Sequence, residues 1–214
     1  MRAKFVFGFS GSFCYTFIMQ PQTFIFFGLS GSGKGTQAKL LIEELNKKDP
    51  EKKVLYLETG ERLREFIKTE SFTSSLTKKV IDAGDLMPEF MPIWIWAGFL
   101  VENLTGNEHI VFDGLSRRAD EAPVLDSAIR FYKRENPIVI SLDVSLEWTT
   151  KHLLSRGRKD DDEEGIKKRL DWYEKNVLPA IEYFKNHPYY KFVSINGEQS
   201  IEAVHQEILE KIGL

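Results

Sequence analysis

From residue 23 onward, short apolar runs alternate with longer segments in which apolar and polar residues mix. The short runs are rich in Val, Ile, Leu and Phe, and most are nearly continuous in their apolar character. Such runs are typical of strands buried on both faces of a parallel sheet. The predicted strands are residues 23–27, 54–58, 109–113, 137–144 and 190–195.

The segments between these runs have helical patterns. We expect helices at 36–46, 119–134, 146–154 and 200–212, and two or three more between 61 and 104. After a charged stretch, RGRKDDDEEG, a long amphipathic helix is predicted, because apolar residues recur every three or four positions: Ile166, Leu170, Tyr173, Val177, Ile181 and Phe184. Strands separated by helices predict an α/β fold, with a five-stranded parallel sheet flanked by helices in three layers.

Turn residues follow three of the predicted strands. Gly28-Leu29, Thr59-Gly60 and Asp113-Gly114 each come directly after an apolar run. In open parallel sheets, ligands bind beyond the carboxyl ends of the strands. We therefore expect these three loops to lie together at a ligand site.

Composition narrows the class of protein. The chain has 214 residues, 42% of them hydrophobic, which is enough for one sizeable core. Its net charge of −3 predicts no bulk attraction to nucleic acid or to an anionic membrane. The apolar stretch 90–101 contains Pro92 and is too short to span a bilayer. Cys14 is the single cysteine, so no disulfide or cysteine zinc site forms within one chain, in keeping with a cytoplasmic location.

The first 18 residues stand apart from this pattern. They carry two basic residues, Arg2 and Lys4, near the start and continue as a diluted apolar run. Three interpretations remain open: an extension upstream of a start at Met19, an added strand or hydrophobic flap, and a targeting segment. The first is favoured, so the expected organisation is an extension at 1–18 and a single domain at 19–214. Deletion of 1–18 is then expected to leave activity largely unchanged.

The segment GLSGSGKGT follows an apolar strand and precedes a helix, which is the context of a P-loop. Its glycines allow backbone N–H groups to turn toward phosphate oxygens, and the helix N-terminus adds a favourable dipole. The alternative is a glycine-rich turn that happens to carry a lysine. The predicted ATP-binding residues are Gly28, Ser30, Gly31, Ser32, Gly33, Lys34, Gly35 and Thr36.

A similar octapeptide, FVFGFSGS, occurs at residues 5–12. It continues as Phe13-Cys14, where the second copy has Gly33-Lys34. The first copy therefore lacks the lysine and the glycine that a phosphate cradle needs, and we expect it to bind no phosphate.

In the P-loop, Gly35 intervenes between Lys34 and Thr36, and Gln37 follows. This GKGT form resembles adenylate kinases and their nucleoside monophosphate kinase relatives. The resemblance extends over residues 23–214 and implies a P-loop NTPase fold, ATP and a nucleoside monophosphate as substrates, and Mg²⁺ as cofactor. Thr36 is the expected metal-binding hydroxyl, with Ser32 as the alternative. Gln199 is a further ATP-binding residue that the resemblance implies.

Two segments resemble the part of the family that binds the acceptor monophosphate, here about residues 59–88. TGERLR at 59–64 is similar to the family's TGD-x-LR, which implies that Thr59 lies at the base and Arg64 at the α-phosphate. GDLMP at 84–88 is similar to the segment whose backbone follows the acceptor nucleoside. It implies contacts from Asp85, Leu86 and Met87.

DGLSR at 113–117 matches the family's DGFPR at its Asp, Gly and Arg. The match implies that Gly114 and Arg117 bind the acceptor and that Asp113 orients water on magnesium. Leu115-Ser116 replaces Phe-Pro, so the geometry of this loop is left open.

The segment at about 156–162 resembles a very short lid, and Arg169 follows at the family's spacing. An isolated arginine is usually a solvated surface charge, but several in register with a P-loop indicate a phosphate site. The catalytic residues that the resemblance implies are Lys34, Arg117, Arg156, Arg158 and Arg169. It also implies that Arg156 binds ATP and that Arg158 and Arg169 bind the acceptor. Asp160 and Asp161 are expected to pair with lid arginines, and Asp162 to begin a helix. Because Arg156 and Arg158 are separated by one residue, a shorter lid is expected to shield the reaction from water less completely.

The chemistry of this reaction needs no general base, because the acceptor is already an ionised phosphate oxygen. Catalysis comes from alignment of two anionic phosphates and neutralisation of charge at the transferred group. Arginines suit this task because their planar guanidinium groups bind phosphate in a bidentate manner. The four histidines are taken as structural, except that His152 lies one helical turn before Arg156 and is a candidate to stack on ATP adenine.

Glu121 stands where adenylate kinases carry a glutamine that matches N1 and the N6 amino group of adenine. An ionised glutamate only accepts hydrogen bonds, and guanine would satisfy it better. Thr59 favours AMP, since uridylate/cytidylate kinases usually have alanine there. AMP is therefore the preferred acceptor, with CMP or UMP and then GMP as alternatives, and a nucleotide-binding protein without turnover as an alternative of another class. The expected protein is a monomer without nucleic-acid or membrane partners.

Overall fold

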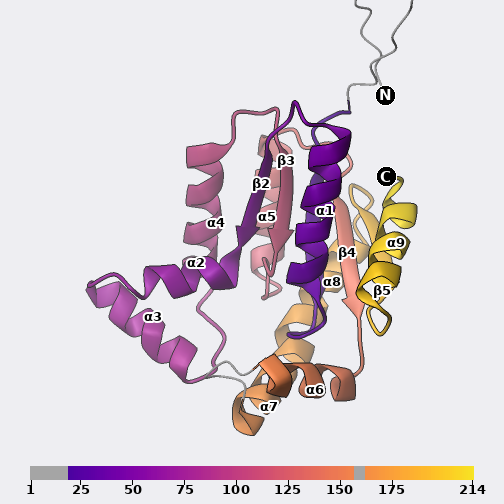
Figure 1. Cartoon of the computed structure of the whole chain (residues 1–214). Helices are drawn as coiled ribbons and strands as arrows, with labels where there is room; N and C mark the ends of the chain where they lie inside the picture. The colour runs from indigo at the N-terminus through magenta and orange to yellow at the C-terminus, as the bar shows by residue number, and fades with distance from the viewer. Residues whose placement is uncertain (1–18, 157–161) are drawn as a thin grey trace, which may run out of the picture.

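The computed structural model describes residues 19–156 and 162–214 of the chain. The extension at 1–18 lies outside these residues. Within them a single parallel sheet runs in the order β2-β3-β1-β4-β5 (Figure 1). The strands are β1 (Thr23–Gly28), β2 (Val54–Glu58), β3 (His109–Asp113), β4 (Ile138–Asp143) and β5 (Lys191–Asn196). This confirms the predicted α/β fold with a five-stranded parallel sheet.

Helices cover both faces of the sheet. In Figure 1, α1 lies in front of the strands and α5 and α8 lie behind them. The helices are α1 (Lys34–Lys48), α2 (Thr59–Phe66), α3 (Phe72–Asp82), α4 (Phe90–Asn103), α5 (Glu121–Phe131), α6 (Leu146–Arg156), α7 (Glu163–Trp172), α8 (Leu178–Lys185) and α9 (Ile201–Ile212).

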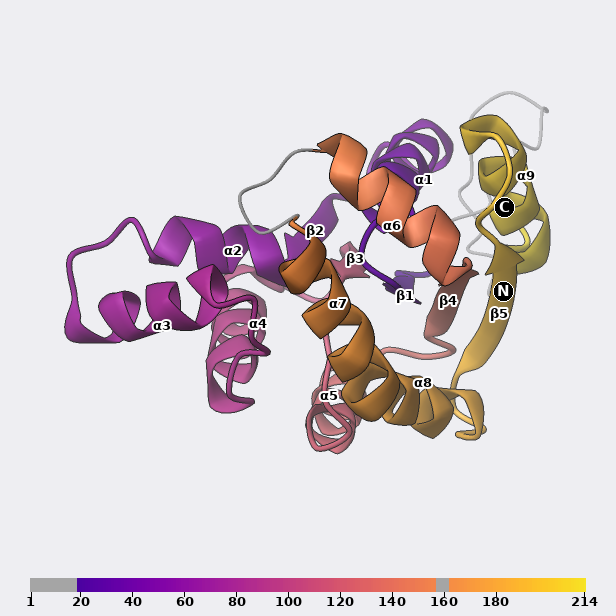
Figure 2. The same cartoon turned by 90° about the horizontal axis from the view of Figure 1, so that it is seen from below.

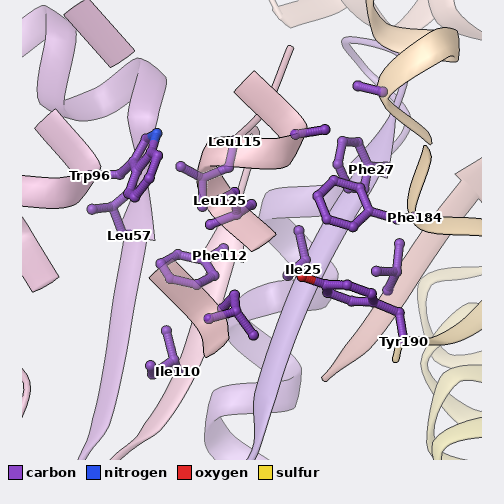
Figure 3. Packing of buried hydrophobic residues seen from close by; sticks show 14 of the residues in the cluster. Ile25, Phe27, Leu57, Trp96, Ile110, Phe112, Leu115, Leu125, Phe184 and Tyr190 are labelled. Atoms are coloured by element: carbon purple, nitrogen blue, oxygen red, sulfur yellow. The ribbon is translucent and has the colours of Figure 1, made fainter. Parts of the chain in front are cut away.

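Alternation along the central strand β1 divides the core into two halves. Ile25 and Phe27 point toward the side of α4, α5 and α8. There Phe27 packs against Phe184, with ring centroids 5.6 Å apart, and Trp96 is buried beside Leu57 in the same cluster (Figure 3). Phe24 and Phe26 point to the opposite face, into a cluster with α1 and α9. Because successive side chains of a strand point to opposite faces, a continuous apolar run fills both halves.

The helices that are expected to bind the acceptor have a small core of their own. Helices α2 and α3 extend to one side of the sheet, where Figure 2 shows them beside α4. Leu63, Met87 and Met91 are buried together in this part. Helix α3 begins with a reciprocal cap in which Ser71 and Ser74 each accept a backbone N–H bond from the other.

The boundaries of several helices differ from those expected. Helix α5 ends at Phe131, because Lys133 and Asn136 have positive φ angles of 52° and 49° before β4 begins. The long amphipathic helix is α7 and α8 joined by a π-helical segment at Tyr173–Val177, with Pro179 just beyond it. Pro179 has no backbone N–H to donate to the preceding turn of the helix. The π-helical segment, whose turn is wider than that of an α-helix, lies where this hydrogen bond is missing.

Candidate active site

The P-loop connects β1 to α1 at the carboxyl end of the sheet. Gly28 has φ of 142°, and a Cβ there would lie 2.6 Å from the backbone oxygen of Leu142. Only glycine fits this position, because the clash is with backbone and not with a flexible side chain. Gly33 caps the helix with φ of 92°, and its carbonyl accepts from the Gln37 N–H at 3.0 Å. The local sequence therefore produces the turn that directs helix N–H groups toward the loop.

Lys34 lies over the P-loop. Its Nζ donates to the carbonyl oxygens of Gly28 at 2.9 Å and Leu29 at 2.7 Å, and it lies 3.5 Å from the hydroxyl of Ser32. These contacts hold the ammonium group at the mouth of the cradle. Thr36 is exposed in the first turn of α1. The structure thus brings the lysine, a buried Ser32 and an accessible threonine hydroxyl to one place.

Asp113 ends β3 and faces the P-loop. It pairs with Phe26 of β1 in the sheet register, and a Cβ on Gly35 would lie 3.4 Å from its Oδ2. The hydroxyl of Tyr56 donates to the same oxygen at 3.4 Å. Burial raises the pKa of Asp113, and the nearby charge of Lys34 opposes that rise.

This set of oxygen donors fits a magnesium ion bound together with nucleotide phosphates. Mg²⁺ prefers oxygen ligands and is usually held by one or two carboxylates plus substrate phosphates and water. Among the described residues, no group of three or more His, Cys, Asp or Glu side chains could hold a metal by itself. Asp113 and Thr36 are instead placed to complete a site that the phosphates help to form.

A pocket opens beside the P-loop, between α2, α4, α7 and the carboxyl ends of β2 and β3. Leu63 and Met87 supply buried apolar wall, and Arg64 and Arg169 supply positive charge. Most of the predicted acceptor residues line it: Thr59, Arg64, Asp85, Leu86, Met87, Gly114, Arg117, Glu121 and Arg169. The structure therefore gathers residues that are more than a hundred positions apart in sequence.

Three residues that line this pocket carry buried polar atoms without a partner. The Thr59 hydroxyl, Oε2 of Glu121 and the indole N–H of Trp172 make no hydrogen bond to the residues that the structure describes. A buried polar atom without a partner costs free energy, typically about 1–3 kcal/mol. Three such atoms around one pocket indicate that a polar ligand satisfies them when it binds.

Two arginines meet at Gly60, next to the pocket wall. A Cβ on this glycine would lie 3.1 Å from Nη1 of Arg64 and 3.7 Å from Nη2 of Arg117. Nη2 of Arg64 is held by Glu58 Oε1 at 2.8 Å. Burial lowers the pKa of Arg117, and the nearby Asp113 carboxylate opposes this; an arginine pKa starts so high that the group remains a cation. Two guanidinium groups that converge in this way are able to bind one phosphate.

The loop after β3 presents Arg117 by an unusual backbone path. Ser116 is buried with φ of 52°, a value that proline cannot adopt. Gly114 has φ of 70°, and a Cβ there would lie 2.8 Å from Nη2 of Arg117. The Arg117 Nε donates to the Gly114 carbonyl at 3.0 Å. The loop at 113–117, whose geometry the sequence left open, therefore turns around Gly114 and does not need the proline that Ser116 replaces.

A second pocket adjoins the first at the P-loop. Its lining residues include Gly28, Ser30 and Lys34 of the P-loop region and Tyr173 and Val177 of the π-helical segment. The two pockets share Gly114, Arg117, Arg169 and Trp172. The shared residues lie where a ligand on the P-loop and a ligand in the acceptor pocket would meet.

Part of the predicted lid lies outside the described residues. Arg158, Asp160 and Asp161 belong to this segment, and for Arg156 only the backbone at the end of α6 is described. Asp162 begins α7 as expected, since its Oδ1 accepts from the Gly165 N–H at 2.7 Å.

Two further candidate residues lie away from both pockets. Gln199 is exposed in the loop after β5, and its amide donates to the Asn196 carbonyl at 2.9 Å and to the Glu207 carboxylate at 2.7 Å. His152 is exposed on α6 and stacks on Trp148 with ring centroids 4.4 Å apart. Neither side chain is seated against the P-loop.

Sequence reasoning missed three residues of the site. Trp172 borders both pockets, and Glu58 holds Arg64. Arg118 donates to the carbonyl oxygens of Met87 at 3.2 Å and Leu86 at 3.4 Å. It thereby ties the loop after β3 to the acceptor segment. The doubled arginine at 117–118 was a signal for this role, whereas nothing in the local sequence marks Trp172.

The fold and the two adjoining pockets define a class of protein, a P-loop phosphotransferase that aligns two phosphorylated ligands. Comparison with known proteins makes this more specific. The family model for adenylate kinase matches residues 26–189. The chain therefore belongs to the adenylate kinase family, whose members are nucleoside monophosphate kinases.

Curated relatives agree with this assignment. An adenylate kinase of Leptospira biflexa is 36% identical over 192 residues, which cover 88% of this chain and 98% of the relative. An adenylate kinase of Azobacteroides pseudotrichonymphae is 35% identical over 87% of this chain and 94% of its own length. Adenylate kinase 1 of a Nostoc species is 31% identical over 88% of this chain and 97% of its own length. No helix among the described residues is both long and apolar enough to cross a membrane.

Proposed function

We propose that this enzyme reversibly transfers the γ-phosphoryl group of ATP to AMP, giving two ADP. Family membership supports phosphotransfer between nucleotides. The observation that carries the proposal is the pair of adjoining pockets, which share Arg117 and Arg169 at their junction. An acceptor bound on one side and a P-loop phosphate on the other would meet at these two cations.

In the proposed mechanism, the P-loop amides and Lys34 bind the β- and γ-phosphates of ATP. Arg64 and Arg117 bind the phosphate of AMP and direct one of its oxygens toward the γ-phosphorus. Arg169 lies between the two phosphates and stabilises the negative charge that spreads over the transferred group. No side chain needs to remove a proton, because the attacking oxygen is already ionised.

Mg²⁺ is proposed as the cofactor. When bound, it would supply positive charge that offsets the charge of the phosphates. Thr36 would bind it directly, and Asp113 would act through a coordinated water. Chelation with EDTA is expected to abolish turnover.

The lid residues Arg156, Arg158, Asp160 and Asp161 are proposed to close over the bound phosphates, with the two aspartates pairing with lid arginines. Gln199 is proposed as a contact of ATP. Its place supports this indirectly, since Gly197 of the same loop lies beside the P-loop: a Cβ there would be 3.5 Å from the Ser32 carbonyl.

We further propose a monomer of residues 19–214 that acts in the cytoplasm, with the acceptor part at about 59–88 and the lid at about 156–162. The charge of −3 supports the absence of nucleic-acid partners.

A coupled assay of ADP formation with ATP and each of AMP, CMP, UMP and GMP tests this function. AMP is expected to give the highest kcat/KM. Lys34→Ala is expected to lower kcat by at least 100-fold, since loss of one electrostatic contact in the transition state costs about 3 kcal/mol. The thermal unfolding temperature of the variant is expected to stay near that of the wild type. Lys39→Ala, an exposed lysine on the same helix, is the matched control. ATP binding without turnover on any acceptor would contradict the proposal.

A further inference from the structure

Glu121 lies in the first turn of α5 with a side chain that is almost completely buried, at 1% exposure. It lines the same pocket as Thr59 and Leu63. The Arg117 backbone donates a hydrogen bond to the carboxyl group. Its Oε2 has no partner among the described residues. This oxygen therefore has hydrogen-bonding capacity that the described residues leave unsatisfied at the pocket wall.

The charge state of this carboxyl group decides which base it can bind. An ionised carboxylate offers only acceptors, and next to adenine it would place a lone pair against the lone pair of N1. A protonated carboxyl group has one O–H donor and one carbonyl acceptor, as a primary amide has. It would therefore present the pattern that adenine requires at N1 and at the N6 amino group.

Resting on the proposed function, we propose that Glu121 selects AMP as a neutral carboxylic acid that donates its O–H to N1 of adenine and accepts from the N6 amino group. The proton comes from solvent, stays on the carboxyl oxygen, and no covalent bond of the nucleotide changes. The same side chain in its ionised form selects guanine, whose N1–H and N2 amino group are adjacent donors.

The surroundings of Glu121 favour the neutral form. Burial raises the pKa of its carboxyl group to about 7, and the charges of Arg117 and Arg118 oppose this rise, while Glu89 at the start of α4 adds to it. Other charged groups that line the pocket are Arg64 of α2, Asp85 before α4 and Arg169 of α7. Bound AMP would bring its phosphate to Arg117 and offset that positive charge. Binding of AMP is therefore expected to raise the pKa of Glu121 further.

The first test compares the KM for AMP of the wild type with that of Glu121→Gln at pH 6, 7 and 8. The protonated fraction of a group with a pKa of about 7 falls about tenfold between pH 6 and pH 8. The ratio of the wild-type KM to the variant KM is expected to rise by up to about tenfold over that range. The variant retains every other titrating group and binds the same phosphate, so the ratio cancels their contributions. A ratio that is constant with pH would overturn the proposal.

A second measurement uses the wild type alone and does not depend on the folding of a variant. Calorimetric titration with AMP or GMP at pH 8, in two buffers of different ionisation enthalpy, reports the protons taken up on binding. We expect close to one proton for AMP and close to none for GMP. Equal uptake for the two nucleotides would overturn the assignment. If AMP supports no turnover at any pH, the proposed function itself fails; turnover with a constant KM ratio contradicts only the role of Glu121.

Discussion

Replacement of Glu121 by glutamine should change how the stability of the ligand-free enzyme depends on pH. The folded protein holds the carboxyl proton more tightly than the unfolded chain does, because burial raises the pKa from 4.5 to about 7. A group with a raised pKa contributes stability that is complete at pH below the unfolded value and is lost as pH rises through the folded value. Glutamine has no proton to lose, so the variant lacks this dependence.

The size of the effect follows from the same two values. Each pKa unit corresponds to about 1.4 kcal/mol, so the full loss for Glu121 is about 3 kcal/mol well above pH 7. Between pH 5 and pH 8, the wild type should lose ~2.5 kcal/mol of unfolding free energy relative to Glu121→Gln. The groups that titrate in both proteins, such as the buried His109, cancel in this difference.

Urea denaturation of both proteins at pH 5, 6, 7 and 8, without nucleotide, measures this difference. The variant should gain on the wild type as pH rises, with equal m-values at each pH. A matched control is Glu135→Gln, which changes an exposed glutamate in the loop after α5 and should run parallel to the wild type. A difference between Glu121→Gln and wild type that does not change with pH would refute the reasoning.

Two further changes test the phosphate site. Arg64→Ala should raise the KM for AMP by about 10- to 100-fold, because a charge-assisted hydrogen bond is worth about 1.5–3 kcal/mol. The KM for ATP should stay unchanged, and an equal rise for ATP would contradict the assignment. Lys68→Ala, which changes an exposed lysine, is the control. Gly114→Ala should lower both kcat/KM and stability, because its Cβ would displace Arg117 and φ of 70° costs about 1–2 kcal/mol for a residue with a side chain. The control is Gly98→Ala in α4, where a Cβ meets no atom within 4 Å; this variant should stabilise the protein by roughly 0.5–1 kcal/mol. Wild-type activity in Gly114→Ala would contradict the role of the turn at Gly114.

The strands and the P-loop were predictable from sequence because local patterns specify them. Continuous apolar runs such as 23–27 and 109–113 report burial on both faces of a strand. In the P-loop, the positive φ angles of Gly28 and Gly33 lie where the sequence has glycine. Helix ends were less predictable, since α5 stops where Lys133 adopts a positive φ that its residue type does not announce.

The acceptor site was predictable only in part. Family motifs placed Arg64 and Arg117 among its residues, and the structure brings their guanidinium groups together around Gly60. The contribution of Trp172 comes from a helix that is remote in sequence and that reaches the junction of the two pockets. Its position depends on how α7 packs, which local pattern does not specify.

The sequence by itself determined the order of strands and helices, the phosphate cradle and the family. These properties depend on short stretches of sequence in which local backbone geometry or phosphate binding requires particular residue types. Only the tertiary structure indicates that the pKa of Glu121 is raised to about 7, because a pKa depends on burial and on charges contributed by other elements. Read along the chain, this glutamate was an anion poorly suited to adenine. Within the folded pocket it is a carboxyl group that can keep its proton near neutral pH.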